Sequence, residues 1–218
     1  MNEPEPEVLV RETYLSHKPA EGSGLAAAAG LLVLAGVSLL SWSDYSGIAR
    51  LLPASGEQVF GQGQYWRLVT SMFVHADLRH LLSNAPGVAG LGYLLYGYFG
   101  GRVYPCLMLA AGLAVTLVAL STYPPHISLL GASGVVYQMA GFWLTLYVGL
   151  ERRHAPGRRL LRAAGFLLVV LVPTSFSPEI SYRTHAIGFG VGVLAATLYF
   201  AVHKTRLRRA EVVETDWE

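Results

Sequence analysis

The chain has 218 residues, of which 53% are hydrophobic and only 14% are charged. Soluble domains carry about 25% charged residues, so this much apolar side chain on so short a chain would overfill a soluble core and is better suited to lipid. The formal net charge of +2 is too small to indicate a nucleic-acid partner. The single cysteine, Cys106, lies in an apolar run and can form no internal disulfide.

The first 24 residues are polar and proline-containing, and three of the first seven are acidic. A secretory signal would instead begin with a short basic segment that leads directly into an apolar stretch. We therefore expect residues 1–24 to form a mobile cytoplasmic tail. The first membrane span is predicted over 25–43, an uncharged stretch of sufficient length.

A long mixed segment, residues 44–79, follows the first span. Its run QYWRLVTSMFVHADLRH combines aromatic, apolar and basic residues. Trp and Arg are favoured at the level of the lipid headgroups. The sequence therefore predicts a partly interfacial element around Trp66 and Arg67.

Five further spans follow from uncharged stretches of membrane-crossing length. Residues 103–150 comprise 48 positions without Asp, Glu, Lys or Arg, which suits two spans separated at Pro124 and Pro125. The fifth stretch is the weakest, because it is short and contains Pro173. The predicted spans are 80–101, 103–122, 128–150, 163–178 and 184–203. The fold class is thus all-α, a polytopic six-helix membrane domain over 25–203 with a cytoplasmic tail at 204–218.

The distribution of Lys and Arg predicts the orientation, because these residues favour cytoplasmic loops. With six spans and both ends inside, the inner segments hold twelve of them and the outer segments four. An arrangement without the fifth span would place one of the two densest basic clusters outside. Six spans with both termini cytoplasmic is the better arrangement.

Polar side chains within membrane spans are costly and usually face the protein interior or a water-filled cavity. Four of them lie near the outer ends of three spans: His80, Asn84, Ser133 and His185. In the predicted orientation spans two, four and six all run from outside to inside. The four residues therefore lie within about two helical turns of one level, which predicts a single site.

Helical spacing predicts how this site is assembled. His80 and Asn84 share a face at i and i+4, as do Ser133 and Tyr137. His185 shares a face with Gly188 and Gly192, and small residues allow helices to approach closely in lipid. The matching small residues on span four are Gly131, Gly134 and Gly141.

Close contact of spans four and six would bring Ser133 within hydrogen-bonding reach of His185. Neutral imidazole is the commonest base that activates a serine. His80 and Asn84, with backbone N–H groups near Ser133, could then donate hydrogen bonds to a developing oxyanion.

Each residue also has a non-catalytic interpretation. A lone membrane serine usually bonds a backbone carbonyl, and a membrane histidine can be a proton relay or a metal ligand. His80 and Asn84 could simply bridge helices. The remaining histidines at loops or span ends are expected to be solvated: His75, His126, His154 and His203.

Four motifs in order, WR at Trp66, HLLSN at His80, GASG at Gly131 and HAIGFGVG at His185, resemble the rhomboid intramembrane serine proteases. The likeness covers about residues 65 to 200. The resemblance implies a nucleophile at Ser133, a general base at His185 and oxyanion stabilisation by His80 and Asn84. It also implies supporting roles for Tyr137, which packs on the catalytic histidine, and for Gly131 and Gly188. It implies a gating role for span five.

The sequence departs from the family pattern at two places. Thr184 stands where a small alanine is usual, and the acidic residue often found near the inner end of span two is missing. The family uses a dyad, so Glu179, expected in a loop, is not predicted to be a third member. We expect no cofactor and no metal ion.

The leading functional hypothesis is an endopeptidase that cuts membrane-spanning substrates near their outer ends, in the bacterial inner membrane. Its partners would be transmembrane substrates and the lipid bilayer. One alternative is a non-catalytic rhomboid-like binder or chaperone of membrane segments, which has usually lost the serine or the histidine. Another is a small transporter or channel, which predicts polar residues continuing to the inner side. The sequence indicates neither the substrate nor the oligomeric state.

Overall fold

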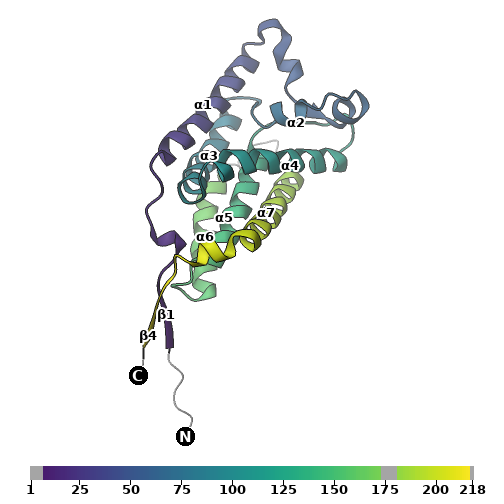
Figure 1. Ribbon diagram of the computed structural model, residues 1–218. Coiled ribbons are helices and arrows are strands. Elements are labelled where there is room, and N and C mark those ends of the chain that lie inside the picture. The colour runs from purple at the N-terminus through teal and green to yellow at the C-terminus, as the bar shows by residue number, and fades with distance from the viewer. Residues whose placement is uncertain (1–6, 173–180, 217–218) are drawn as a thin grey trace.

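The computed structural model describes residues 7–172 and 181–216 and is predominantly helical (Figure 1). Its long helices are α1 (Ser23–Trp42), α3 (Leu78–Phe99), α4 (Met108–Thr122), α5 (Ser133–Leu150), α6 (Pro156–Leu171) and α7 (Tyr182–Arg208). Shorter helical pieces are η1 (Tyr14–Ser16), η2 (Tyr45–Leu51), η3 (Glu57–Gly61), α2 (Arg67–Thr70) and η4 (Arg102–Leu107). The strands are β1 (Glu7–Glu12), β2 (Ala54–Ser55), β3 (Ser128–Leu129) and β4 (Val212–Asp216).

Each predicted span overlaps a long helix, although several bounds differ. Helix α5 begins at Ser133 rather than at 128, because β3 and a glycine turn precede it. Helix α6 begins at Pro156, seven residues before the predicted 163, and α7 continues to Arg208. Residues 173–178 of the predicted fifth span lie outside the described residues, as does Glu179.

Three helical segments within the described residues are long and apolar enough to cross a membrane: Ser23–Trp42, Arg102–Thr122 and Tyr182–Arg208. Helices α3 and α5 carry the polar residues His80, Asn84 and Gln138, which lower their apolar character. Six spans therefore remain a prediction.

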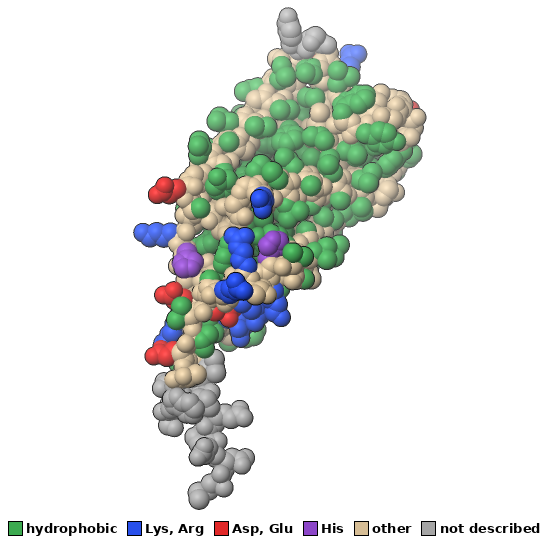
Figure 2. All heavy atoms as spheres, viewed as in Figure 1, with side chains coloured by type: hydrophobic (Ala, Val, Ile, Leu, Met, Phe, Trp, Pro, Cys, Tyr) green, Lys and Arg blue, Asp and Glu red, His purple; other side chains and the backbone are tan. Residues whose placement is uncertain are grey.

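Helix α5 lies at the centre of the bundle and contacts α3, α4, α6 and α7. Its side chains Phe142, Leu146 and Met139 are completely buried. Large apolar side chains on the outer helices are instead exposed, including Leu32, Leu161 and Val202. Figure 2 shows this apolar surface over much of the molecule, with Lys and Arg gathered toward the end where the terminal strands lie. An exposed apolar surface of this extent is typical of a protein surrounded by lipid.

The tails pair with each other, which the expectation of a mobile N-terminal tail did not include. Strands β1 and β4 form an antiparallel pair, with Val10 opposite Val213 (Figure 1). The η1 turn that follows β1 contacts the end of α3, since the Tyr14 hydroxyl donates to the Tyr98 carbonyl oxygen at 2.8 Å. The all-α prediction therefore missed this strand pair and the short pair β2–β3.

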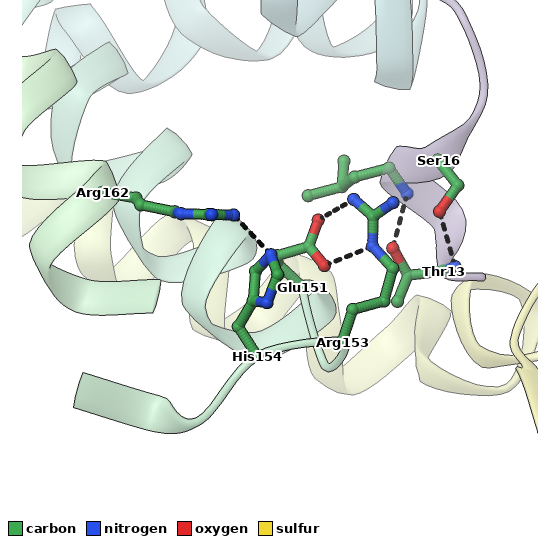
Figure 3. A network of polar contacts seen from close by, with 7 residues as sticks. Thr13, Ser16, Glu151, Arg153, His154 and Arg162 are labelled. Atoms are coloured by element: carbon green, nitrogen blue, oxygen red, sulfur yellow. Dashed lines mark hydrogen bonds and ion pairs between the residues drawn. The ribbon is translucent and has the colours of Figure 1, made fainter. Parts of the chain in front are cut away.

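A polar network closes this end of the bundle, hereafter the terminal end (Figure 3). The Glu151 carboxylate is buried and accepts two hydrogen bonds from Arg153, at 2.7 and 2.6 Å. Burial alone would raise the pKa of Glu151, but the hydrogen bonds and charge of Arg153 outweigh it and lower that pKa. Nearby, Arg162 hydrogen-bonds His154, and Thr13 and Ser16 cap the η1 turn.

The segment between α1 and α3 is held by a buried arginine. Arg67 donates to the carbonyl oxygens of Arg50 and Pro53, at 3.0 and 2.7 Å. Its neighbour Trp66 has 51% of its surface exposed. This arrangement suits a folded segment that presents an aromatic ring to the lipid interface.

Candidate active site

Ser133 is the first residue of α5, and a tight turn leads into it. Gly131 has φ of +108°, a conformation that favours glycine, and its N–H donates to the Ser71 carbonyl oxygen at 2.9 Å. A Cβ at Gly131 would lie 2.7 Å from two ring atoms of His80. Gly131 therefore lies against the histidine of α3, and not in the α5–α7 contact that the helical spacing predicted.

The start of α3 brings His80 and Asn84 to the same region. The Asp77 side chain caps the helix by accepting from the His80 N–H at 2.7 Å. Asn84 is completely buried, and its amide nitrogen donates to the His80 carbonyl oxygen at 2.9 Å. The Asn84 Oδ1 atom has no hydrogen-bond partner among the described residues. A buried polar atom without a partner is costly and often marks a functional site.

Helix α7 brings His185 to α5 through glycines. A Cβ at Gly188 would clash with the carbonyl oxygen of Gly134, and one at Gly192 with that of Gln138. A Cβ at Gly141 would clash with the carbonyl oxygen of Phe189. The predicted glycine contact is therefore present at Gly134, Gly141, Gly188 and Gly192.

The His185 ring is buried and stacks on Tyr137, with ring centroids 4.0 Å apart and planes 10° apart. Since Gly188 touches the residue after Ser133, the serine and His185 lie on facing turns of touching helices. Within the described residues no hydrogen bond joins their side chains. Such bonds are often long without a substrate and tighten when it binds.

His75 was expected to be solvated, and that prediction was wrong. Its ring is 1% exposed, and its Nε2 accepts from the N–H of Ala132, the residue before Ser133, at 3.3 Å. Its Nδ1–H donates to the Ser38 hydroxyl at 3.0 Å, and that hydroxyl donates in turn to the Phe73 carbonyl oxygen. Burial, with a smaller contribution from nearby His80, lowers the pKa of His75 to about 3, so the ring is neutral.

His75 also meets His80 edge to face, with ring centroids 5.0 Å apart. It therefore supports both the turn before Ser133 and the ring of His80. The sequence signal that could have predicted the burial of His75 is the preceding apolar stretch Met72 to Val74, whose two end residues are also buried. His203 also differs from its prediction, because its ring is half-buried and stacks on Tyr199.

A cavity of about 40 Å³ opens beside Ser133. Its lining includes Ser71, Thr116, Ser181 and Thr184. This volume holds about one water molecule or a small side chain. Among the described residues no group of three His, Cys, Asp or Glu side chains could hold a metal ion.

The Rhomboid domain family matches residues 62–202, well over half of the chain. This protein belongs to the rhomboid family. The match contains Trp66, His80, Ser133 and His185, so the resemblance carried by these motifs is confirmed at the level of the family. With its apolar helices, the protein is a helical integral membrane protein.

Three named relatives share this region. The chain is 28% identical to the rhomboid protease GluP of Bacillus subtilis (strain 168) over 121 residues, 55% of this chain and 22% of that protein. It is 31% identical to Rhomboid-related protein 2 of Mus musculus over 157 residues, 66% of this chain and 51% of that protein. It is 26% identical to the putative rhomboid protease YdcA of Bacillus subtilis (strain 168) over 137 residues, 62% of this chain and 68% of that protein. The matches thus span about a fifth and about half of the first two relatives.

Proposed function

We propose that this rhomboid is an intramembrane serine endopeptidase in which Ser133 is the nucleophile and His185 the general base. The observation that carries the proposal is the glycine contact between α5 and α7. It places Ser133 opposite a buried imidazole whose orientation is fixed by stacking on Tyr137. The family includes relatives named as proteases, which supports the same conclusion.

The reaction would proceed in two steps. His185 takes the hydroxyl proton of Ser133 as its oxygen attacks the scissile carbonyl carbon, and the protonated imidazole then gives that proton to the leaving amine. Water, with His185 again as base, releases the acyl group from Ser133. No acidic third member is required.

The negative charge that develops on the carbonyl oxygen would be stabilised at the start of α5. The N–H of Ser133 lies in the first turn, where helical N–H groups have no intrahelical acceptor and the helix dipole favours negative charge. The side chains of His80 and Asn84 would add donors from α3. His75, by accepting a hydrogen bond from the N–H of Ala132, would stabilise the conformation of this turn.

The substrate would be a membrane-spanning segment cut near the outer face. A peptide bond inside a membrane helix is inaccessible, so segments that unwind easily, with Gly or Pro near the outer leaflet, should be preferred. We place Ser133 toward the outside and both termini in the cytoplasm, with six spans in a bacterial inner membrane. The basic side chains gathered toward the terminal end support this orientation (Figure 2).

The function is tested by labelling with a serine-directed fluorophosphonate and by cleavage of a model membrane substrate. Wild-type protein should be labelled and active, whereas Ser133→Ala should be neither. Ser128→Ala removes an exposed hydroxyl from the nearby strand β3 and should behave as wild type. His185→Ala should also abolish cleavage, and the double variant should be no worse because the two residues act together. Cleavage retained by Ser133→Ala would contradict the proposal, and a folded but inert wild type would favour a non-catalytic binder.

The topology is tested by reporter fusions. A fusion after residue 60 should report outside, and fusions after residue 155 or at the C-terminus should report inside. The fusion after residue 155 is the most informative one. An external signal there would place the Ser133 end of α5 toward the cytoplasm and contradict the proposed orientation.

A further inference from the structure

The start of α7 is tied to the end of α4 by contacts on the outer side of Ser133. The Tyr123 hydroxyl hydrogen-bonds the Ser181 hydroxyl at 2.5 Å. Arg183 donates to the carbonyl oxygen of Thr122, the last residue of α4. Its guanidinium carbon also lies 4.8 Å from the centroid of the Tyr123 ring, within the range of a cation–π contact.

The Ser181 hydroxyl is fully used in this network. It accepts from the Thr184 N–H at 3.3 Å, which caps α7, and it donates to the Thr184 hydroxyl at 2.6 Å. Its one hydrogen is therefore committed to Thr184, so Tyr123 must be the donor in the bond between Tyr123 and Ser181. A hydroxyl has one donor and two acceptor positions, and here all three are occupied.

Thr184 gives this network a direct contact with α5. Its methyl carbon would lie 3.1 Å from a Cβ at Gly134, the residue after Ser133. The Thr184 hydroxyl accepts from Ser181, while its methyl group lies beside Gly134, the residue that follows the proposed nucleophile.

His185 needs such support because it is the fourth residue of α7. The first turn of a helix has unsatisfied N–H groups and frays readily. The first backbone bond of α7 runs from the His185 N–H to the Ser181 carbonyl oxygen at 3.0 Å. Movement of Ser181 would therefore be transmitted directly to the proposed base.

We propose that Tyr123, Ser181, Arg183 and Thr184 form an outer latch that positions His185 for proton transfer from Ser133. The latch fixes the height of the imidazole relative to α5, while Tyr137 fixes its tilt. Among the described residues none of the four forms a hydrogen bond with the side chain of Ser133 or His185, so we assign them as positioning residues and not catalytic ones. This inference rests on the proposed function.

The test measures kcat and KM for a model substrate, together with the rate of fluorophosphonate labelling. Tyr123→Phe removes only the hydroxyl and keeps the ring under Arg183. We expect kcat and the labelling rate to fall together by about fivefold to a hundredfold, the range between loss of one net hydrogen bond and a displacement of about 1 Å. KM should stay unchanged.

Two comparisons separate positioning from general damage. Tyr182→Phe makes the same change at the next tyrosine, whose side chain is 72% exposed and makes no hydrogen bond among the described residues, and should match wild type. Ser181→Thr keeps the hydroxyl and should retain most of the activity, whereas Ser181→Ala should lose as much as Tyr123→Phe.

Wild-type kcat in both Tyr123→Phe and Ser181→Ala would overturn the latch and leave the proposed function intact. A loss expressed in KM alone would also overturn it, because it would indicate substrate contact and not alignment of the base. Failure of the proposed function has a different signature, since Ser133→Ala would then be labelled or active regardless of the latch.

Discussion

The two ends of the molecule differ in how deeply their polar side chains are buried. Near Ser133, polar groups such as His75 and Asn84 are completely buried among apolar helices and glycine contacts. At the terminal end, charged side chains form ion pairs, and in the Arg11–Glu214 pair both side chains are about 60% exposed. Buried polar contacts fix geometry because an unpaired partner is costly, whereas exposed ion pairs contribute little. Substitutions near Ser133 should therefore change activity, and those at the terminal end should change stability alone.

Among the residues that support Ser133 and His185, the largest effect is expected at Asn84. Asn84→Ala removes a proposed oxyanion donor, and turnover should fall by about 10- to 1,000-fold. Fluorophosphonate labelling should be retained in part, because Ser133 and His185 are unchanged. Ser83→Ala alters the preceding residue, whose hydroxyl bonds a backbone carbonyl of its own helix, and serves as the control. Wild-type turnover in Asn84→Ala would assign oxyanion binding to His80 and the backbone.

The glycine contact gives the next effect. Gly188→Val would force α7 away from the Gly134 carbonyl oxygen, and a displacement of about 1 Å can cost about a hundredfold in rate. Activity and thermal stability should both fall, although no chemical group of the site changes. Gly190→Val changes the same helix at a position where an added Cβ meets no atom within 4 Å, and it should be close to wild type. A fully active Gly188→Val would contradict the contact that brings Ser133 and His185 together.

A smaller effect on activity is expected at His75, together with an effect on stability that depends on pH. Its pKa is about 3 in the folded protein against an ordinary value of 6.5. As the pH falls, the unfolded chain therefore binds a proton at this histidine at a higher pH than the folded protein does. The stabilisation is thus complete above pH 6.5 and is lost as the pH falls from 6.5 toward 3. In melting curves across this range, His75→Gln should be less stable than wild type at pH 7, and the difference should shrink as the pH falls.

The same variant should lower kcat by about tenfold, because the Ala132 N–H loses its acceptor and the turn before Ser133 loosens. A His126→Gln control changes an exposed histidine and should alter neither quantity. A stability difference between His75→Gln and wild type that is constant with pH would contradict the buried neutral ring.

The smallest effects on activity are expected at the terminal end. Glu151→Ala breaks the paired carboxylate and should lower the free energy of unfolding by about 1–2 kcal/mol, less than for a fully buried pair since Arg153 is partly exposed. Arg11→Ala should cost at most about 1 kcal/mol. Thermal unfolding measures these losses of stability. Cleavage assays on both variants should show an unchanged kcat. A large loss of kcat in Glu151→Ala would break the contrast between the two ends.

The two regions also differ in how much of their structure the sequence predicted. The spacing of His185, Gly188 and Gly192 is a local property of one helix, and it correctly predicted the face that α7 turns toward α5. The burial of His75 depends on Ser38 and Ala132, which come from other parts of the chain. A histidine in a loop has no periodic pattern of its own that distinguishes a solvated ring from a buried one, and only the neighbouring apolar stretch Met72 to Val74 pointed to burial.

By itself, the sequence determined the helical membrane character, the family, and the residues Ser133 and His185 that lie on facing turns. The membrane character follows from composition and charge spacing, the facing turns follow from helical periodicity, and the family was indicated by the resemblance of four short motifs. Only the tertiary structure decided that β1 pairs with β4, that Gly131 faces His80, and that Tyr123 holds Ser181. These contacts join residues separated by 51 to about 200 positions, where pairing depends on how the helices pack and leaves no periodic signal in the chain.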